Sequence, residues 1–150
     1  MSKELSYLNR INQAFSDVSG FYESLVKEIG LSYPEFLILY KLFTENDLTQ
    51  KNISVQHHIP KQTVNHIIKK FVESGYILLV YKESNSKEKV IRLTNEGLTI
   101  INQKIEPIIR IEEEVIRRMG FETADQLINI TIIYASLFDA IRKEFKNESI

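Results

Sequence analysis

Residues 49–94 read TQKNISVQHHIPKQTVNHIIKKFVESGYILLVYKESNSKEKVIRLT, and this stretch decides the fold. It begins with two short helical patterns that meet at Pro60, since proline is tolerated in a first helical turn and disfavours helix in the residue before it. Two β-prone runs follow, at Ile77–Tyr81 and Val90–Leu93, and the segment between them is polar and turn-like. This order of two helices and a hairpin predicts a winged helix-turn-helix.

The second short helix has one apolar face and one polar face. Its apolar residues recur at i, i+3, i+4 and i+7, which predicts a single buried face. Lys, Asn and Gln on the other face can hydrogen-bond base edges or phosphates in a DNA major groove. A solvated face without a specific role is the alternative, and the hairpin that follows favours the DNA-reading interpretation. The apolar face comprises Val64, Ile67, Ile68 and Phe71, and the polar face comprises Lys61, Gln62, Asn65, His66 and Lys69.

The ordered motifs of this region resemble the MarR family (multiple antibiotic resistance regulators) of bacterial transcription factors. The resemblance extends over the whole chain, because one long helix precedes the module and two follow it. It implies a mostly α fold with a small β-hairpin wing, in which a winged helix-turn-helix is flanked by N- and C-terminal dimerisation helices. The matching residues are Leu48-Thr49-Gln50, Lys61-Gln62-Thr63-Val64, Glu73-x-Gly75-Tyr76-Ile77 and Leu93-Thr94-x-x-Gly97.

The resemblance implies a single domain, residues 1–150, with the winged helix-turn-helix DNA-binding module at 32–94 and dimerisation helices at 1–30 and 95–146. Apolar residues at alternating steps of three and four before residue 30 agree with a long amphipathic helix. Pro107 predicts a kink in the helix that follows the wing. A twofold dimer of the flanking helices would place two recognition helices on one face of DNA. An intramolecular bundle within one chain is the alternative.

The wing and the turn depart from the family pattern. The family usually has Asp-x-Arg near the wing tip, with the Arg in the minor groove, and here the matching residues are Asn85 and Lys87. Lysine lacks the planar fork of arginine, so we expect weaker or less A·T-selective wing contacts. Pro60 stands where many members have a small hydroxyl residue, which puts a phosphate contact there in doubt. His57 stands where members often have a buried leucine, which predicts a core histidine or a weak spot in the packing.

The function implied by the resemblance is that of a homodimeric transcriptional regulator, most often a repressor, which binds a pseudo-palindromic operator in double-stranded DNA. A winged-helix protein-interaction module without specific DNA binding is the alternative. The residues expected to read base edges are Lys61, Gln62, Asn65 and His66, those expected to touch phosphates are Thr63 and Lys69, and those expected near a flanking minor groove are Asn85, Lys87 and Lys89.

A small-molecule effector is also implied by the resemblance. Many family members bind aromatic acids or amphipathic compounds between the dimer helices and the winged module. For each aromatic residue taken alone, a plain role in the core is the alternative. The residues expected to line such a cleft are Phe15, Tyr22, Tyr33 and Phe36.

The charge distribution agrees with a DNA-binding module. The whole chain carries a net charge of −1, which alone argues against DNA binding. Residues 49–94 hold eight basic and three acidic side chains, a net charge of +5, so the remainder carries −6. A basic module on an acidic body is the electrostatic pattern expected of a DNA-binding protein.

Composition excludes several classes of function. The chain has 150 residues, enough for one domain with a real core, and no cysteine, which excludes disulfides, thiolate nucleophiles and cysteine-based zinc sites. We find no catalytic constellation, cofactor motif or helical metal-ligand spacing, so we expect neither an enzyme nor a cofactor or metal. No apolar run is long enough to cross a bilayer, and the first residues, MSKELSYLNR, have no apolar signal-peptide core. We therefore expect a cytoplasmic protein without a membrane partner.

Overall fold

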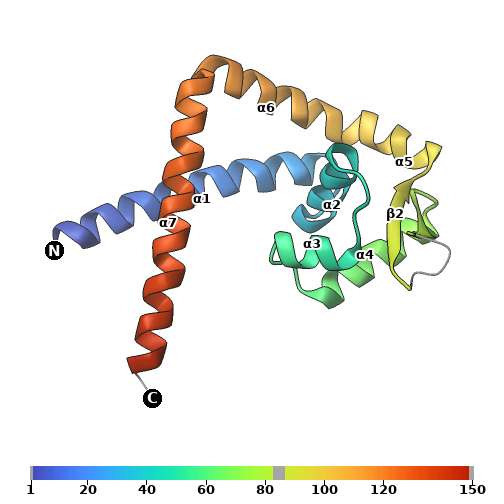
Figure 1. Ribbon diagram of the computed structural model, residues 1–150. Helices are drawn as coiled ribbons and strands as arrows, with labels where there is room; N and C mark the ends of the chain where they lie inside the picture. The colour runs from blue at the N-terminus through green and yellow to red at the C-terminus, as the bar shows by residue number, and fades with distance from the viewer. Residues whose placement is uncertain (1, 83–86, 149–150) are drawn as a thin grey trace. The chain divides into compact units, whose positions relative to one another are not determined.

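The computed structural model describes residues 2–82 and 87–148 (Figure 1). The described chain is mostly helical with a two-stranded antiparallel sheet, so the expected fold class is confirmed. It groups into two compact units, residues 1–108 and 109–150; the expectation of a single domain stays a prediction. The elements are α1 (Lys3–Glu28), α2 (Tyr33–Thr44), α3 (Gln50–Gln56), α4 (Lys61–Glu73), β1 (Ile77–Tyr81), β2 (Lys89–Leu93), α5 (Asn95–Ile100), the π-helical turn η1 (Ile101–Ile105), α6 (Glu106–Met119) and α7 (Phe121–Glu148).

The helix-turn-helix consists of α3 and α4, and its boundaries follow from local chemistry. The Thr49 hydroxyl accepts a hydrogen bond from the Asn52 amide at 3.1 Å, which caps the start of α3. His58 lies in the turn with a φ of 52°, a left-handed conformation in which His is enriched among non-glycine residues. Pro60 then precedes α4, which begins at Lys61. The predicted helix boundary at the proline is therefore confirmed.

The apolar face of α4 is buried, as its periodicity predicted. Val64, Ile67, Ile68 and Phe71 are each at most 5% exposed. The helix packs against α3 and β1. Burying a side chain of this size stabilises a fold by about 1.5–3 kcal/mol relative to leaving it exposed. The burial of this face directs the opposite, polar face of α4 toward solvent.

The wing is a hairpin of β1 and β2 that is joined to the loop before α3. The two strands pair with Leu79 opposite Ile91. Ile77 and Ile91 are buried, which anchors the inner face of the hairpin in the core. The Ile91 amide also donates a hydrogen bond of 2.8 Å to the Leu48 carbonyl. The base of the wing is thereby attached to the start of the helix-turn-helix.

Two glycines shape the junction of α4, β1 and α5. Gly75 follows α4 with a φ of +73°, and the Tyr76 amide donates to the Phe71 carbonyl at 2.9 Å, as in a Schellman helix end. Gly97 lies in the first turn of α5, where an added Cβ would lie 2.0 Å from the Tyr76 carbonyl oxygen. Only glycine permits this close approach of helix and strand.

The helical stretch after the wing contains a π turn. α5 continues into η1, after which the Glu106 amide donates to the Ile101 carbonyl, five residues earlier. Pro107 follows, and a proline within a helix removes a donor and crowds the preceding turn. A π turn at residues 101–105 thus precedes Pro107, and the kink expected from the proline stays a prediction. Ile101 and Ile105 are fully buried where η1 packs against α2.

Residues 109–150 form a unit whose large apolar side chains are mostly exposed. On α7, Phe121 is 78% exposed, Ile130 64% and Ile132 58%. Ala124 is the only buried residue among the described residues of α7. Monomeric proteins rarely expose large contiguous apolar surfaces. The single chain therefore leaves apolar surface of this unit without a covering partner.

Glu35 connects the start of α2 to α4. Its Oε2 accepts hydrogen bonds of 2.8 Å from the amide and the hydroxyl of Ser32, and its Oε1 accepts one of 2.5 Å from Lys70 Nζ. Burial raises the pKa of this carboxyl, but the bonds from Lys70 and Ser32 outweigh that effect and hold the pKa below 4.5. One buried carboxylate thus serves both as a helix cap and as a tertiary ion pair.

His57 directly follows the last residue of α3 and is partly buried. Its Nε2 is shielded from solvent and has no hydrogen-bond partner among the described residues. Burial, followed by the positive charge of Lys41, lowers the pKa of His57 below 6.5, and Glu45 opposes the shift. The imidazole is therefore held neutral, with one polar atom unsatisfied. The expected weak spot in the packing lies here.

Replacing His57 by Leu should raise the free energy of unfolding by about 1 kcal/mol near neutral pH, because an unsatisfied buried polar atom is removed. The gain should be larger near pH 5.5 than near pH 8. The folded pKa of His57 lies below the unfolded value, so wild-type stability is lost as pH falls below 6.5. Urea denaturation at both pH values measures this. The exposed control His66→Asn should keep the wild-type pH dependence, because His66 is not among the groups that shift the pKa of His57. An equal gain at both pH values for His57→Leu would contradict the assignment.

Replacing Glu35 by Gln should lower the free energy of unfolding by about 1.5–3 kcal/mol at neutral pH, the range for hydrogen bonds to charged groups. The folded pKa of Glu35 is depressed, so its contribution is present above 4.5 and is lost as pH falls through the folded pKa. The variant should therefore approach wild-type stability in acid. The control Glu73→Gln removes a carboxylate from an exposed pair with Lys69 and should cost less than about 1 kcal/mol. Equal losses in both variants would refute the role of Glu35.

Candidate nucleic-acid interface

The polar face of α4 presents most of the residues predicted to contact DNA. Thr63 is half-buried, and the other predicted residues of this helix are exposed. Because the opposite face is locked in the core, the polar side chains have a defined direction. The exposed residues are Lys61, Gln62, Asn65, His66 and Lys69.

A hollow lies between the start of α3 and the start of α4. It has a volume of about 430 Å³ and is lined by two lysines, two glutamines and one asparagine. The two lining residues from α3, Gln50 and Lys51, were not predicted as site residues from the sequence. Their place at the start of the supporting helix is the feature that could have indicated them. All five side chains have polar ends that donate hydrogen bonds, the chemistry needed to hold phosphates or base acceptors. The lining residues are Gln50, Lys51, Lys61, Gln62 and Asn65.

The two lysines in the second half of α4 differ in their surroundings. Lys69 is exposed, and its Nζ lies 3.8 Å from a Glu73 carboxylate oxygen. Lys70 instead reaches back to Glu35 at 2.5 Å. Both lysines are exposed, but Lys70 is engaged by a nearly buried carboxylate of α2, whereas Lys69 has only a long contact within its own helix.

The described residues of the wing carry basic side chains near its tip. Lys87 and Lys89 are both exposed. Lys89 Nζ lies over the Tyr81 ring, 5.0 Å from its centroid, a cation–π contact that positions the ammonium group. Asn85, the remaining residue predicted for the wing, lies outside the described residues.

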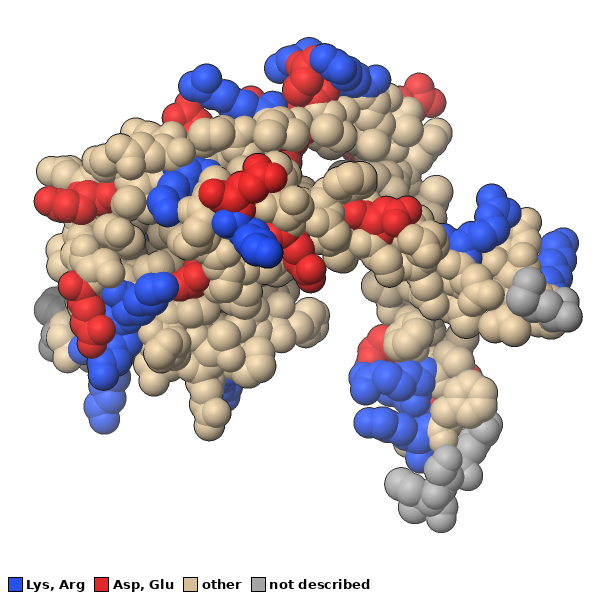
Figure 2. All heavy atoms as spheres, turned by 180° about the vertical axis from the view of Figure 1, so that it is seen from behind, with Lys and Arg blue, Asp and Glu red and all other residues tan. Residues whose placement is uncertain are grey.

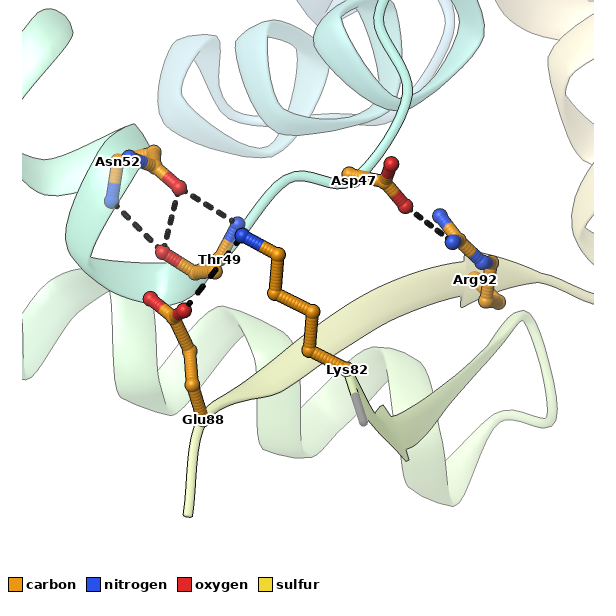
Figure 3. A network of polar contacts seen from close by, with 6 residues as sticks. All are labelled: Asp47, Thr49, Asn52, Lys82, Glu88 and Arg92. Atoms are coloured by element: carbon orange, nitrogen blue, oxygen red, sulfur yellow. Dashed lines mark hydrogen bonds and ion pairs between the residues drawn. The ribbon is translucent and has the colours of Figure 1, made fainter. Parts of the chain in front are cut away.

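Polar contacts attach the wing to the loop before α3 (Figure 3). Arg92 of β2 forms an ion pair with Asp47, and this hydrogen bond, aided by the arginine charge, lowers the pKa of Asp47. Asp47 itself has a φ of 57°, a conformation that Asp tolerates better than most residues. At the other end of the hairpin, Lys82 Nζ lies 3.8 Å from a Glu88 oxygen. Neither Asp47 nor Arg92 was singled out from the sequence as a site residue.

Basic and acidic side chains are mixed on the face drawn in Figure 2. Figure 2 shows lysine and arginine side chains projecting from the lower left of the view, on the side where the wing lies, with acidic side chains beside them. Residues 49–94, which carry a net charge of +5, form the helix-turn-helix and the wing. Such a local basic surface attracts the phosphate backbone despite the net charge of −1 for the chain.

Three of the four aromatic residues predicted to line a ligand cleft lie together. The rings of Tyr22, Tyr33 and Phe36 have centroids 6.2–6.4 Å apart. Phe36 is 3% exposed and belongs to the core. Phe15 is 46% exposed and is not among the described residues that line the cleft found beside Tyr22 and Tyr33. That cleft, of about 230 Å³, is lined by Val18, Ser19, Tyr22, Glu23 and Tyr33.

Within residues 2–82 and 87–148, no group of three or more His, Asp or Glu side chains is placed to hold a metal ion. In the same part of the chain, no helix has the length and apolar character needed to cross a membrane.

Comparison with known proteins agrees with this geometry. The family model described as "Transcriptional regulator SarA/Rot" matches residues 20–105. The HTH-type transcriptional regulator SarZ of Staphylococcus saprophyticus is 25% identical over 109 residues, 73% of this chain and 71% of SarZ. NMB1585, a MarR family regulator from Neisseria meningitidis, superposes with a TM-score of 0.82 at 22% identity, over 92% of this chain and 97% of that one.

A second solved structure contains DNA. The Staphylococcus aureus MepR–DNA complex superposes with a TM-score of 0.68 at 18% identity, over 91% of this chain and 99% of that one. The winged-helix fold inferred from the resemblance to the MarR family is thus confirmed, and the matched residues 20–105 include the helix-turn-helix and the wing. The chain belongs to the SarA/Rot family of transcriptional regulators.

Proposed function

We propose that this chain is a homodimeric repressor that binds a pseudo-palindromic site in double-stranded DNA. The observation that carries the proposal is the hollow between α3 and α4, where Lys51 and Lys61 lie beside the exposed amides of Gln62 and Asn65. These groups match what a major groove offers, namely phosphates at its edges and base acceptors on its floor. The structure of MepR bound to DNA supports the same use of this fold.

In the proposed complex, α4 enters the major groove with its N-terminal half foremost. Asn65 and Gln62 are suited to bidentate contacts with adenine, whereas lysines are suited to guanine. Thr63 and Lys69 are assigned to phosphates, and Lys51 of α3 joins them as a phosphate contact. The wing would bring Lys87 and Lys89 to a flanking minor groove, and Asn85 is assigned there from the sequence.

The dimer is supported by exposed apolar side chains in both units. On α1, Phe21 is 70% exposed and Leu5 45%, and on α7 Phe121 and Ile130 are both more than 60% exposed. A second copy related by a twofold axis would cover such surfaces, as closed homodimers do. Two recognition helices would then contact half-sites about 34–36 Å apart along the DNA.

Release of the repressor by a small-molecule effector completes the proposal. A ligand that binds better to a dimer with incorrectly spaced recognition helices would lower DNA affinity by its differential affinity for that state. The cleft lined by Tyr22 and Tyr33 is the assigned site.

The function is tested by selecting genomic fragments that the purified full chain binds, and then footprinting them at two salt concentrations. We expect symmetric protection of an inverted repeat, lost at high salt because phosphate contacts release counterions. Asn65→Ala and His66→Ala should each weaken binding to that repeat by about 1–3 kcal/mol per lost base contact.

The control is Asn12→Ala on α1, which should bind as wild type does, and light scattering should show that every variant keeps the same oligomeric state. Wild-type binding by both α4 variants would contradict the assignment of the recognition face. Binding that is weak and indifferent to sequence in the wild type would favour a protein-interaction module instead.

Lys51→Ala tests the contact that only the structure indicates. It should lower affinity for specific and unrelated DNA alike, because phosphates carry no base information. The slope of log affinity against log salt should shrink by about 0.9, the value for one lost phosphate contact. Lys143→Ala on α7, which pairs with Asp139, is the matched control and should leave the slope unchanged. An unchanged slope for Lys51→Ala would remove this residue from the interface.

A further inference from the structure

The cleft beside the first turn of α2 has a chemical character that the aromatic residues alone do not indicate. It lies where the second half of α1 meets Tyr33, the first residue of α2. Its volume of about 230 Å³ suits a small organic molecule with one ring. Val18 and the two tyrosines supply apolar and aromatic surface, Ser19 supplies a hydroxyl, and Glu23 supplies a carboxylate.

Glu23 sets the electrostatics of this cleft. It is the only charged side chain among the described residues that line it. Within residues 2–82 and 87–148, no hydrogen bond or ion pair engages its carboxylate. A carboxylate attracts cations and repels anions, and a low-dielectric aromatic wall strengthens both effects. An unpaired negative charge beside two aromatic rings therefore disfavours an aromatic acid.

The aromatic rings favour the same sign of charge. Tyr22 and Tyr33 meet edge to face, with centroids 6.3 Å apart and planes at 70°. Phe36, buried behind them, lies 6.4 Å from the first ring and 6.2 Å from the second. Ring faces carry negative potential and attract ammonium groups. Because the core holds Phe36 in place, the two tyrosines are supported before any ligand arrives, which reduces the cost of ordering them.

We propose that this cleft binds a small aromatic or amphipathic organic cation. Glu23 supplies the counter-charge, the faces of Tyr22 and Tyr33 contact the cationic head or its ring, and Val18 contacts the apolar part. This inference refines the effector of the proposed function.

The cleft is connected to the recognition helix through α2. Tyr33 is two residues before Glu35, whose carboxylate holds Lys70 of α4 at 2.5 Å. A ligand that displaces the first turn of α2 therefore disturbs the Glu35–Lys70 ion pair. This consequence rests on the proposed function, whereas cation binding does not.

The test compares two probes of opposite charge that share one benzyl group, benzyltrimethylammonium and benzylsulfonate, by chemical-shift titration of the isotope-labelled full chain. We expect the cation to bind about twofold to fivefold more tightly than benzylsulfonate, which is the preference expected for one exposed charge pair. Glu23→Gln should abolish most of this preference, and Tyr33→Leu should weaken cation binding about twofold to fivefold through loss of the ring face. The matched control is Glu28→Gln at the end of α1, which lies outside the cleft lining and should behave as wild type.

Equal or tighter binding of benzylsulfonate would overturn the proposal, and so would an unchanged cation preference in Glu23→Gln. A third contradicting result is the absence of chemical-shift changes at cleft residues with either probe at about 10 mM, a concentration at which a ligand of this size is expected to occupy a well-formed site. DNA affinity is measured on the same preparations without probe. A chain that fails to bind DNA but keeps the Glu23-dependent preference would refute the proposed function and leave the cation site standing. Specific DNA binding without that preference would refute the cation site and leave the proposed function standing.

Discussion

The burial of one face of α4 is the constraint on which the rest of the reading module depends. Val64, Ile68 and Phe71 are almost inaccessible, so rotating the helix about its axis would expose large apolar side chains. At about 1.5–3 kcal/mol for each, that rotation is prohibitive for a fold of ordinary stability. The polar face therefore points outward in one direction only. A helix held in this way can present Gln62 and Asn65 as a preorganised surface.

Polar contacts between distant residues set the position of the parts around α4. The Glu35–Lys70 pair ties α4 to the start of α2, and the Asp47–Arg92 pair ties the wing to the loop before α3. The first is the stronger constraint, because Glu35 is nearly buried and accepts three hydrogen bonds. The second is exposed, and surface ion pairs contribute little energy. The backbone bond from Ile91 to Leu48 therefore matters more for anchoring the wing.

The surfaces that one chain leaves uncovered have two different characters. Apolar side chains such as Phe21 and Phe121 lie exposed on helices that the reading module itself does not need. The cleft at Glu23 is instead mixed, with aromatic walls and one carboxylate. Apolar faces suit a second copy of the chain, because hydrophobic burial is not directional. A charged cleft of small volume suits a small ligand of complementary charge.

Local patterns along the sequence determined the helix-turn-helix, the hairpin, the buried face of α4 and the glycine helix end at Gly75, because each depends on periodicity or backbone preference within one element. Five of the candidate DNA contacts on α4 were identified in this way as exposed residues of one face. Packing of the elements alone determined that Lys70 pairs with Glu35, 35 residues away. It also placed Lys51 in the hollow beside Lys61 and Glu23 with Tyr33 in one cleft. These pairings depend on how elements pack, and no periodicity within a single element encodes which side chains of two different elements meet.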